Sequence, residues 1–245
     1  TDADVIINGS RCSNFGYSVA SAGDFNGDGK DDVIIGDHNL SDVSVITKAY
    51  IFFGGITGTL NDTSADVIIN GQNVGDKFGN PVSSAGDFNG DGKDDVIIGA
   101  RLDDNNSLTS SGSAFIFFGG VSGTKTADAD ADVILNGQNA GDQFGGSVAS
   151  AGDYNGDGKG DVIVGAHLDD NNSETDSGSA FIFFGGITGT KRADADADVI
   201  LNGQSAGDNF SGSYTSNNPD QYQSFGLATG DFNGDGASDV IVGAN

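Results

Sequence analysis

Asp24-Phe25-Asn26-Gly27-Asp28-Gly29-Lys30-Asp31-Asp32, followed by Val33-Ile34-Ile35-Gly36, is the stretch around which this chain is organised. The same pattern returns at residues 87–95, 153–161 and 231–239. In each copy, loop positions 1, 3, 5 and 9 carry a side-chain oxygen, and positions 4 and 6 are glycine. A pattern that recurs in this way predicts a protein built from repeated units.

The oxygen-bearing positions predict four calcium sites. Ca²⁺ takes six to eight oxygen ligands, and glycines allow a short loop to turn its oxygen atoms inward. Position 7 is lysine in three loops and alanine in the fourth, so we expect its backbone carbonyl to be the ligand. The expected ligands are Asp24, Asn26, Asp28, Lys30 and Asp32; Asp87, Asn89, Asp91, Lys93 and Asp95; Asp153, Asn155, Asp157, Lys159 and Asp161; and Asp231, Asn233, Asp235, Ala237 and Asp239.

An EF-hand loop begins in the same way but differs further on. It needs a bidentate glutamate at position 12 and a helix on each side. Position 12 here is Ile35, Ile98, Val164 or Val242, and the residues after each loop form a short β-branched run typical of a strand. EF-hand and dockerin-like folds are therefore excluded. The remaining alternative is a set of Asp/Gly turns without metal, in which the unneutralised carboxylates would repel one another.

Beyond the loops, a Phe-Gly pair, a short strand, the Asp-rich loop and a Val-Ile-Ile-Gly-Ala run together resemble the FG-GAP repeat of integrin α-subunit β-propellers and their bacterial relatives. The resemblance covers essentially the whole chain, but the proline of the family's Gly-Ala-Pro is absent. It implies an all-β fold, a β-propeller of four-stranded antiparallel blades with a calcium loop between strands A and B. The Phe-Gly pairs that carry the resemblance are Phe15-Gly16, Phe78-Gly79 and Phe144-Gly145.

The intervals between the loops predict the domain organisation. The loops recur after 63, 66 and 78 residues, a period that suits blades of four short strands better than a solenoid. We predict one domain over residues 1–245, a propeller or part of one. Its repeats are approximately 10–71, 72–137, 138–203 and 204–245, the last of them incomplete. The expected strands are 17–22, 32–35, 48–53 and 65–69; 82–85, 95–98, 113–118 and 131–135; and 148–151, 161–164, 179–184 and 197–201.

In an up-and-down blade, the A–B and C–D loops share one face and the B–C and D–A loops share the other. The long polar loops 103–111 and 169–176, with the insertion at 211–222, are therefore expected opposite the calcium loops. Variable loops on a rigid scaffold commonly carry binding, so we expect a protein or glycan ligand there; a solvated insertion without a partner is the alternative. The Asp-Ala repeats at 128–132 and 194–198 are expected to be extended, charged outer edges.

Composition indicates an extracellular or cell-surface protein. The net charge is −26, which argues against nucleic acid and anionic lipid as partners. No apolar run is long enough to span a membrane, so no membrane insertion is expected. The single cysteine, Cys12, cannot form an internal disulfide, so we expect calcium rather than disulfides to stabilise the fold. Because the chain contains no methionine, we expect a processed form or part of a longer protein.

The expected function is a calcium-stabilised extracellular binding or adhesion module without catalysis of its own. His38 and His167 lie in different repeats, with no nucleophile motif nearby. One alternative is a building block of a surface layer, sheath or filament. The other is an accessory propeller of a polysaccharide-active enzyme, as the resemblance includes lyases and lipases that carry such modules.

The two ends of the chain predict incomplete closure of the propeller. Residues 3–9 match strand D of the later repeats, whereas residues 240–243 match strand B, so a strand C is missing between them. The family's propellers usually have seven blades. We therefore expect self-association or a larger propeller, completed by further chain or by another copy.

Overall fold

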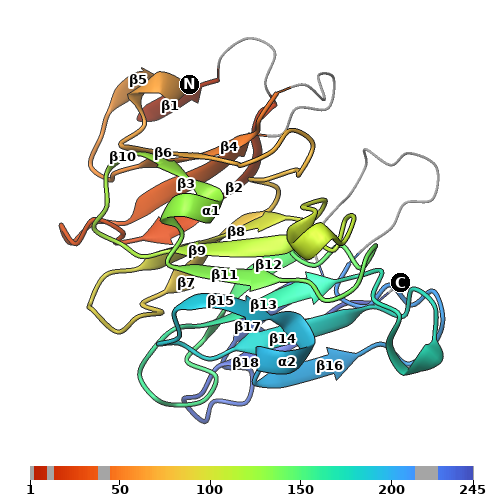
Figure 1. The fold of residues 1–245 in the computed structure, drawn as a ribbon. Coiled ribbons are helices and arrows are strands. Elements are labelled where there is room, and N and C mark those ends of the chain that lie inside the picture. Colours follow the sequence, from red (N-terminus) through yellow and green to blue (C-terminus); the bar gives the residue numbers. More distant parts are fainter. Residues whose placement is uncertain (1–2, 10–13, 38–44, 213–225, 245) are drawn as a thin grey trace.

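The computed structural model describes residues 3–9, 14–37, 45–212 and 226–244, and the prediction of an all-β chain is confirmed (Figure 1). The helical elements are the single turns α1 (Ala127–Asp130) and α2 (Ala193–Asp196) and 3-10 turns at Asp62–Ser64, Asn105–Ser107 and Asn171–Ser173. The strands are β1 (Val5–Asn8), β2 (Phe15–Gly23), β3 (Asp32–Asp37), β4 (Lys48–Phe52), β5 (Gly58–Asn61), β6 (Val67–Asn70), β7 (Val82–Gly86), β8 (Asp95–Ala100), β9 (Ser113–Phe117), β10 (Gly123–Thr126), β11 (Val133–Asn136), β12 (Ser147–Gly152), β13 (Asp161–Ala166), β14 (Ser179–Phe183), β15 (Gly189–Arg192), β16 (Val199–Asn202), β17 (Leu227–Gly230) and β18 (Asp239–Val242).

The strands form sheets that repeat along the chain. Unit 1 has the order β2-β3-β4-β6, unit 2 has β7-β8-β9-β11 and unit 3 has β12-β13-β14-β16, with antiparallel neighbours throughout. Unit 4 is the antiparallel hairpin β17-β18. In the first three units these strands agree with the predicted ones to within two residues at each end.

One strand in each of units 1 to 3 was not predicted. β5, β10 and β15 follow the third strand of their units and pair in parallel with the last strand before the unit, namely β1, β6 and β11. The prediction of purely antiparallel four-stranded sheets is therefore wrong at the outer edge, where units 1 and 2 have a fifth, parallel strand. This strand ties each unit to its neighbour through backbone hydrogen bonds.

The Asp-Ala repeats also differ from the prediction. Residues 127–130 and 193–196 form single helical turns rather than extended edges. In the first repeat, Asp130 accepts a hydrogen bond from the Thr126 amide at 2.7 Å, and Asp132 accepts one from the Phe118 amide at 2.8 Å. Asp196 and Asp198 make the equivalent contacts in the second repeat. A short Asp side chain that binds nearby backbone amides competes with extended pairing.

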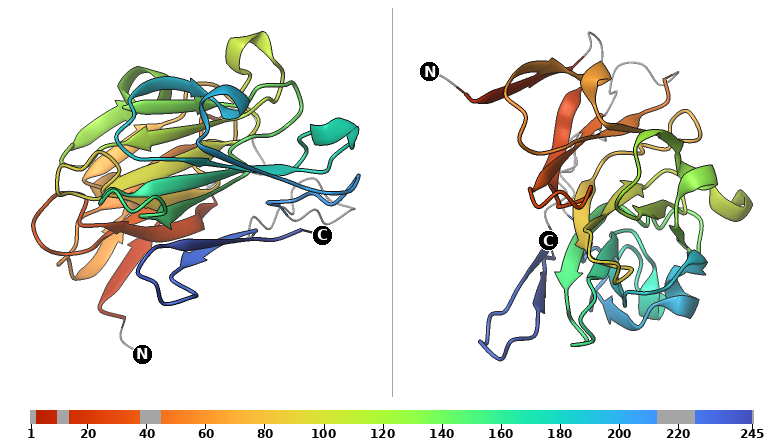
Figure 2. Two further views of the ribbon diagram at one scale, coloured as in Figure 1. Left: turned by 90° about the horizontal axis from the view of Figure 1, so that it is seen from below. Right: turned by 90° about the vertical axis from the view of Figure 1, so that its left-hand side faces the viewer.

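The hydrophobic core lies between successive sheets. Ile34 and Ile51 of unit 1 belong to one cluster with Val96 and Phe115 of unit 2. The same arrangement recurs between units 2 and 3 and between units 3 and 4. Figures 1 and 2 show the sheets following one another in chain order, with the first and last units at opposite ends of the stack. In each of the pairs Phe52-Phe53, Phe117-Phe118 and Phe183-Phe184, the first ring is fully buried and the second is half-buried.

Strand register places the two sets of loops at opposite ends of the units. β8 begins directly after an Asp-rich loop, and its far end, Ala100, pairs with Ser113. Ser113 in turn pairs with Asn136, so the polar loop 101–112 lies at the end remote from the Asp-rich loop. The predicted separation of these loops is confirmed. Most of the 211–222 insertion, with Cys12 and His38, lies outside the described residues.

Candidate metal centre

Glycines at positions 4 and 6 shape each Asp-rich loop. Gly27 and Gly29 have φ values of +78° and +86°, and the corresponding glycines of the other three loops lie between +77° and +91°. Residues with a Cβ adopt this left-handed region at a steric cost, so the tight turn favours glycine at both positions.

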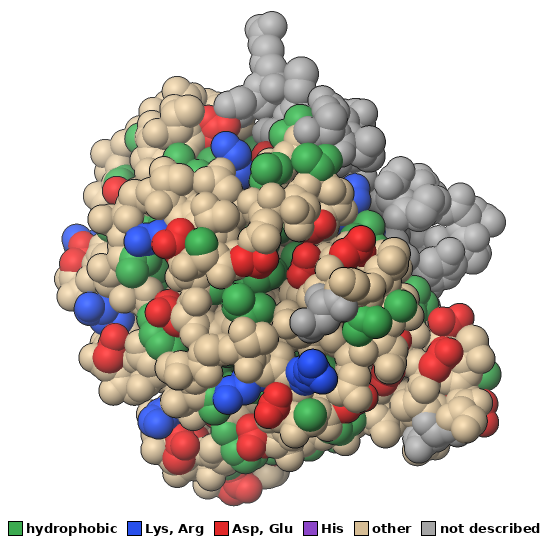
Figure 3. Space-filling model, in the orientation of Figure 1, with side chains coloured by type: hydrophobic (Ala, Val, Ile, Leu, Met, Phe, Trp, Pro, Cys, Tyr) green, Lys and Arg blue, Asp and Glu red, His purple; other side chains and the backbone are tan. Residues whose placement is uncertain are grey.

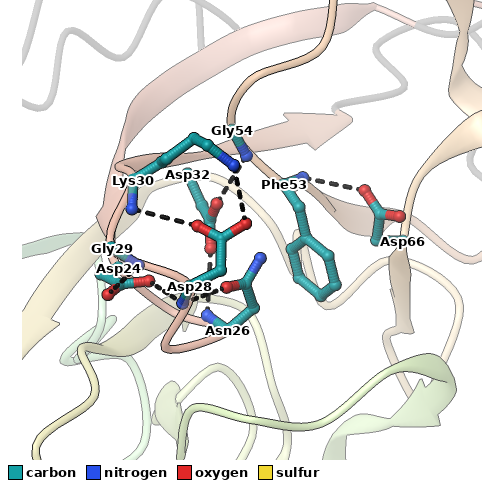
Figure 4. A network of polar contacts seen from close by, with 9 residues as sticks. All are labelled: Asp24, Asn26, Asp28, Gly29, Lys30, Asp32, Phe53, Gly54 and Asp66. Carbon is teal, nitrogen blue, oxygen red and sulfur yellow. Dashed lines mark hydrogen bonds and ion pairs between the residues drawn. The ribbon is translucent and has the colours of Figure 1, made fainter.

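The oxygen-bearing side chains of positions 1, 3 and 5 fold into the loop (Figure 4). Asp24 accepts hydrogen bonds from the amides of Asp28 and Gly29, both at 2.9 Å. Asn26 accepts from the Asp28 amide at 2.7 Å, and Asp28 accepts from the Lys30 amide at 3.0 Å. The other three loops repeat these contacts. The structure thus brings together the side chains that the sequence singled out.

The carboxylate at position 9 closes the loop from within the protein. Asp95 is fully buried, accepts from the Asn89 amide at 3.1 Å, and accepts from the Gly119 amide at 2.8 Å. Burial raises its pKa to about 7, although these amides oppose the shift. Asp32 and Asp161 have equivalent contacts, and burial raises the pKa of each. These carboxyls are buried where a compensating positive charge would hold them ionised.

Position 7 contributes its backbone to the loop. The Lys30, Lys93 and Lys159 amides donate to the position-5 aspartates at 2.9–3.0 Å. The Lys30 ammonium forms an exposed ion pair with Asp28 at 3.1 Å, and this hydrogen bond lowers the Asp28 pKa. The role of the position-7 carbonyl as a ligand stays a prediction.

The donor set of the loops fits a hard divalent cation. Every predicted ligand is an oxygen of a carboxylate, an amide side chain or a backbone carbonyl, which suits Ca²⁺ and not a thiolate- or imidazole-seeking metal. Among the described residues, no three His, Cys, Asp or Glu side chains are grouped as a metal cluster. The loop carboxylates bind backbone amides instead, and because a carboxylate has about four lone-pair positions, capacity remains for a cation.

Each of the first three loops is also docked on the next unit. The amides of Asp94, Gly160 and Ser238 donate to the carbonyl of position 1 in the preceding loop, at 3.2, 2.9 and 3.4 Å. Position 2 adds a buried ring, because Phe25 and Phe88 are fully buried between units. The Asp-rich loops are therefore part of the junctions between units.

Sequence reasoning missed a second set of aspartates. Asp66, Asp132 and Asp198 accept hydrogen bonds from the amides of the second phenylalanine of each Phe-Phe pair, at 2.8, 2.8 and 2.7 Å. The next residue in each case is the glycine whose amide binds the position-9 carboxylate. The recurrence of Phe-Phe-Gly-Gly with Ala-Asp-Val was the available signal for this support.

Comparison with known proteins agrees with this geometry. The FG-GAP repeat family matches residues 15–46, 79–117 and 144–183. The chain contains three FG-GAP repeats. Integrin alpha-5 of Xenopus laevis is 34% identical over 241 residues, which are 95% of this chain and 20% of that protein. Integrin alpha-PS2 of Drosophila melanogaster is 30% identical over 181 residues, 72% of this chain and 12% of that protein.

An enzyme is also among the relatives of this FG-GAP protein. Phosphatidylinositol-glycan-specific phospholipase D of Bos taurus is 28% identical over 158 residues, 62% of this chain and 18% of the enzyme. The chain therefore spans a fifth or less of the length of these three curated relatives.

At the end of the FG-GAP units remote from the Asp-rich loops lies a polar hollow of about 350 Å³. Asn73, Asp103, Asp104, Asp128 and Asn136 are among its lining residues. Asp103 accepts a hydrogen bond from the Ser113 hydroxyl at 2.6 Å, and burial raises the Asp103 pKa. The hollow therefore offers carboxylates and amides to a ligand.

In the part of the chain that the structure describes, the histidine of unit 3 is buried rather than presented at the surface. His167 is 3% exposed, and burial followed by the Arg101 charge lowers its pKa to about 4. Figure 3 shows Asp and Glu side chains spread over one face and interspersed with fewer Lys and Arg side chains. No helix in the described part of the chain has the length and apolar character needed to cross a bilayer.

Proposed function

We propose that this FG-GAP protein is a calcium-stabilised adhesion module, secreted or at the cell surface, whose units are β-propeller blades. The observation that carries the calcium proposal is the burial of the position-9 carboxylates, Asp32, Asp95 and Asp161, at the closed end of oxygen-lined loops. Burying a carboxylate is costly unless a cation compensates it. The net charge of −26 shows that lysine and arginine do not balance the aspartates of this chain.

Calcium would act on the junctions between units. Each loop would hold the ion through its positions 1, 3, 5 and 9 and the carbonyl of position 7. The bound ion would supply positive charge to the buried carboxylate and fix the loop. Because the same loop docks on the next unit through its backbone and its position-2 ring, a fixed loop stabilises the contact between sheets.

The adhesion proposal is supported by the integrin alpha relatives and by the polar hollow. The hollow lies where FG-GAP units present their long loops, away from the calcium loops, and its carboxylates and amides suit a protein or glycan ligand. We propose no catalysis by the described residues, among which the histidine, His167, is buried. The phospholipase relative favours, as second candidate, an accessory propeller of an enzyme.

Thermal unfolding with and without chelator tests the calcium proposal. An ion that binds only the folded state at 100 times its dissociation constant stabilises by about 2.7 kcal/mol per site. EDTA should therefore lower the Tm strongly, Ca²⁺ should restore it, and Mg²⁺ should restore it poorly because of its stricter octahedral geometry. A melting curve that EDTA leaves unchanged would contradict calcium binding.

A glycan array and a protein pull-down, repeated with matched variants, test the adhesion proposal. Asp104→Ala with Asp128→Ala removes two exposed carboxylates from the hollow. Asp170→Ala with Asp194→Ala removes their exposed equivalents from unit 3 and is the control. A captured ligand should be lost with the first pair and kept with the second. Equal capture by both would place the ligand elsewhere.

A further inference from the structure

The first unit of the stack exposes apolar residues that the later units bury. Val19 on β2 is 59% exposed, whereas its equivalents Val82 and Val148, which the preceding unit covers, are 5% and 8% exposed. Val33 on the neighbouring strand β3 is 37% exposed. We call this side, toward which a preceding unit would lie, the front face of unit 1.

The last unit exposes the opposite kind of surface. Phe232 is 57% exposed, whereas Phe25 and Phe88 at the same loop position are fully buried against the following unit. Ile241 on β18 is 53% exposed, whereas its equivalent Ile163 is fully buried. This side, toward which a following unit would lie, is the rear face of unit 4.

The two faces are the complementary halves of one interface that the molecule already contains three times. Within the chain, the rear face of each unit packs on the front face of the next, and the strands that neighbour each other are β2 and β7, β7 and β12, and β12 and β17. Docking β17 of one copy against β2 of another would repeat this contact between neighbouring strands.

The extent of the exposed front face matches a two-stranded unit. On unit 1, the outer residues Ile35, Tyr50 and Phe52 are already buried in a cluster that β1 and β5 help to form. β1 lies parallel to β5 as β6 lies parallel to β10, so it occupies the outer-strand position of a preceding unit. The part of the front face that stays uncovered is the inner part, on β2 and β3. The hairpin β17-β18 consists of the two inner strands of a unit, which are the strands that would cover it.

The polar contacts of the junction are also available at the two faces. Between units 1 and 2, the Asp24 amide donates to the Asp94 carboxylate at 2.7 Å, and the Asp94 amide donates to the Asp24 carbonyl at 3.2 Å. The corresponding residues of the two faces are Asp231 and Asp31, and both are exposed. A docked copy could form the same reciprocal pair.

We propose that the rear face of unit 4 in one copy of this chain docks on the front face of unit 1 in a second copy, head to tail. The contact is heterologous, so it generates a closed ring or an open stack. Two copies that each carry a charge of −26 repel one another, and salt screens that repulsion. Association should therefore strengthen as ionic strength rises, unlike one based on surface ion pairs.

Light scattering on the 245-residue chain, with Ca²⁺ and moderate salt, tests the proposal through two variants. The front variant combines Val19→Asp and Val33→Asp, and the rear variant combines Phe232→Asp and Ile241→Asp. The wild-type mass should rise above 24.7 kDa with concentration, while each variant alone stays at 24.7 kDa. Mixed together, the variants should form a dimer of about 49 kDa, twice that mass, because each keeps the face that the other lacks.

Controls separate docking from misfolding and from other contacts. Val74→Asp replaces a residue that is 47% exposed outside both faces, and it should associate like the wild type. If circular dichroism shows that a double variant has lost its fold, the uncharged changes Val19→Ser and Ile241→Ser repeat the test. The proposal is overturned if the wild type stays at 24.7 kDa, if only one variant loses association, or if the mixture forms no dimer.

Discussion

At the scale of single residues, Phe88 and Phe232 share a loop position but differ in burial. Phe88 is fully buried between units 2 and 3, whereas Phe232 is 57% exposed. Phe88→Ala should lower the free energy of unfolding by about 3–5 kcal/mol, because it leaves a cavity. Phe232→Ala should change it by at most about 0.5 kcal/mol at a protein concentration where the chain is monomeric. Denaturant unfolding in Ca²⁺ buffer measures both, and equal losses would contradict this account of the junctions.

The buried Asp142 predicts a pH dependence that does not involve the Asp-rich loops. Burial, followed by the charge of Asp169, raises its pKa to about 7, above the ordinary value of 3.8. Because the raised pKa means that the folded state favours the protonated carboxyl, the contribution of this group to folding stability is fully present below pH 4. It is lost as the pH rises through 7. Asp142→Asn should therefore be more stable than the wild type at pH 8, by on the order of 1–3 kcal/mol, and not at pH 4.

Thermal melts of both proteins across this pH range, in Ca²⁺ buffer, measure the effect. The opposite shift of His167 is present in both proteins, so it cancels in the difference. If the difference in Tm between Asp142→Asn and the wild type did not change with pH, burial would not be raising the pKa of Asp142.

At the scale of elements, the Asp-rich loop is the smallest unit that we propose to bind an ion. Asp157→Ala removes the position-5 oxygen of the third loop, which accepts the Lys159 amide at 2.9 Å. Calorimetric titration should then show one Ca²⁺ fewer than in the wild type, because repeats interact mainly with their nearest neighbours.

Lys93→Ala is the matched variant for the backbone role of position 7. If the carbonyl is the ligand, this change should keep the full number of ions, because the side chain of position 7 would not be needed; the fourth loop already has an alanine there, Ala237. Loss of an ion with Lys93→Ala would show that the side chain, or the loop conformation it supports, matters for binding.

At the scale of the whole molecule, stability should decrease from the middle of the stack to its ends. Unit 2 is covered on both faces, whereas β17 and β18 are four-residue strands with one face uncovered. Hydrogen exchange should be slowest in β8 and β9 and fastest in β17 and β18, because protection follows local burial and contact density. At a concentration where copies associate, protection of β17 and β18 should rise; uniform exchange along the chain would contradict this order.

Much of the candidate site could be predicted from the sequence because its determinants are local. Glycines at positions 4 and 6 and oxygens at 1, 3, 5 and 9 act within nine residues, and the β-branched run that follows forms a strand from its own pattern. These features recur in each repeat, so the strands of units 1 to 3 could be placed to within two residues. The sequence by itself thus determined the recurring units, the four antiparallel strands of units 1 to 3 and the residues of the loops.

Only the tertiary structure decided what depends on distant partners. The parallel pairing of β10 with β6 joins residues that are 56 positions apart, such as Gly123 and Val67, and no short pattern announces it. Likewise, Phe232 and Phe88 occupy the same position of the Asp-rich loop. Phe232 is nevertheless exposed and Phe88 buried, because burial depends on the neighbouring unit. The same holds for the position-9 carboxylates and the two uncovered faces. The type of a residue is a local property, but whether its side chain is removed from water depends on how the sheets pack together.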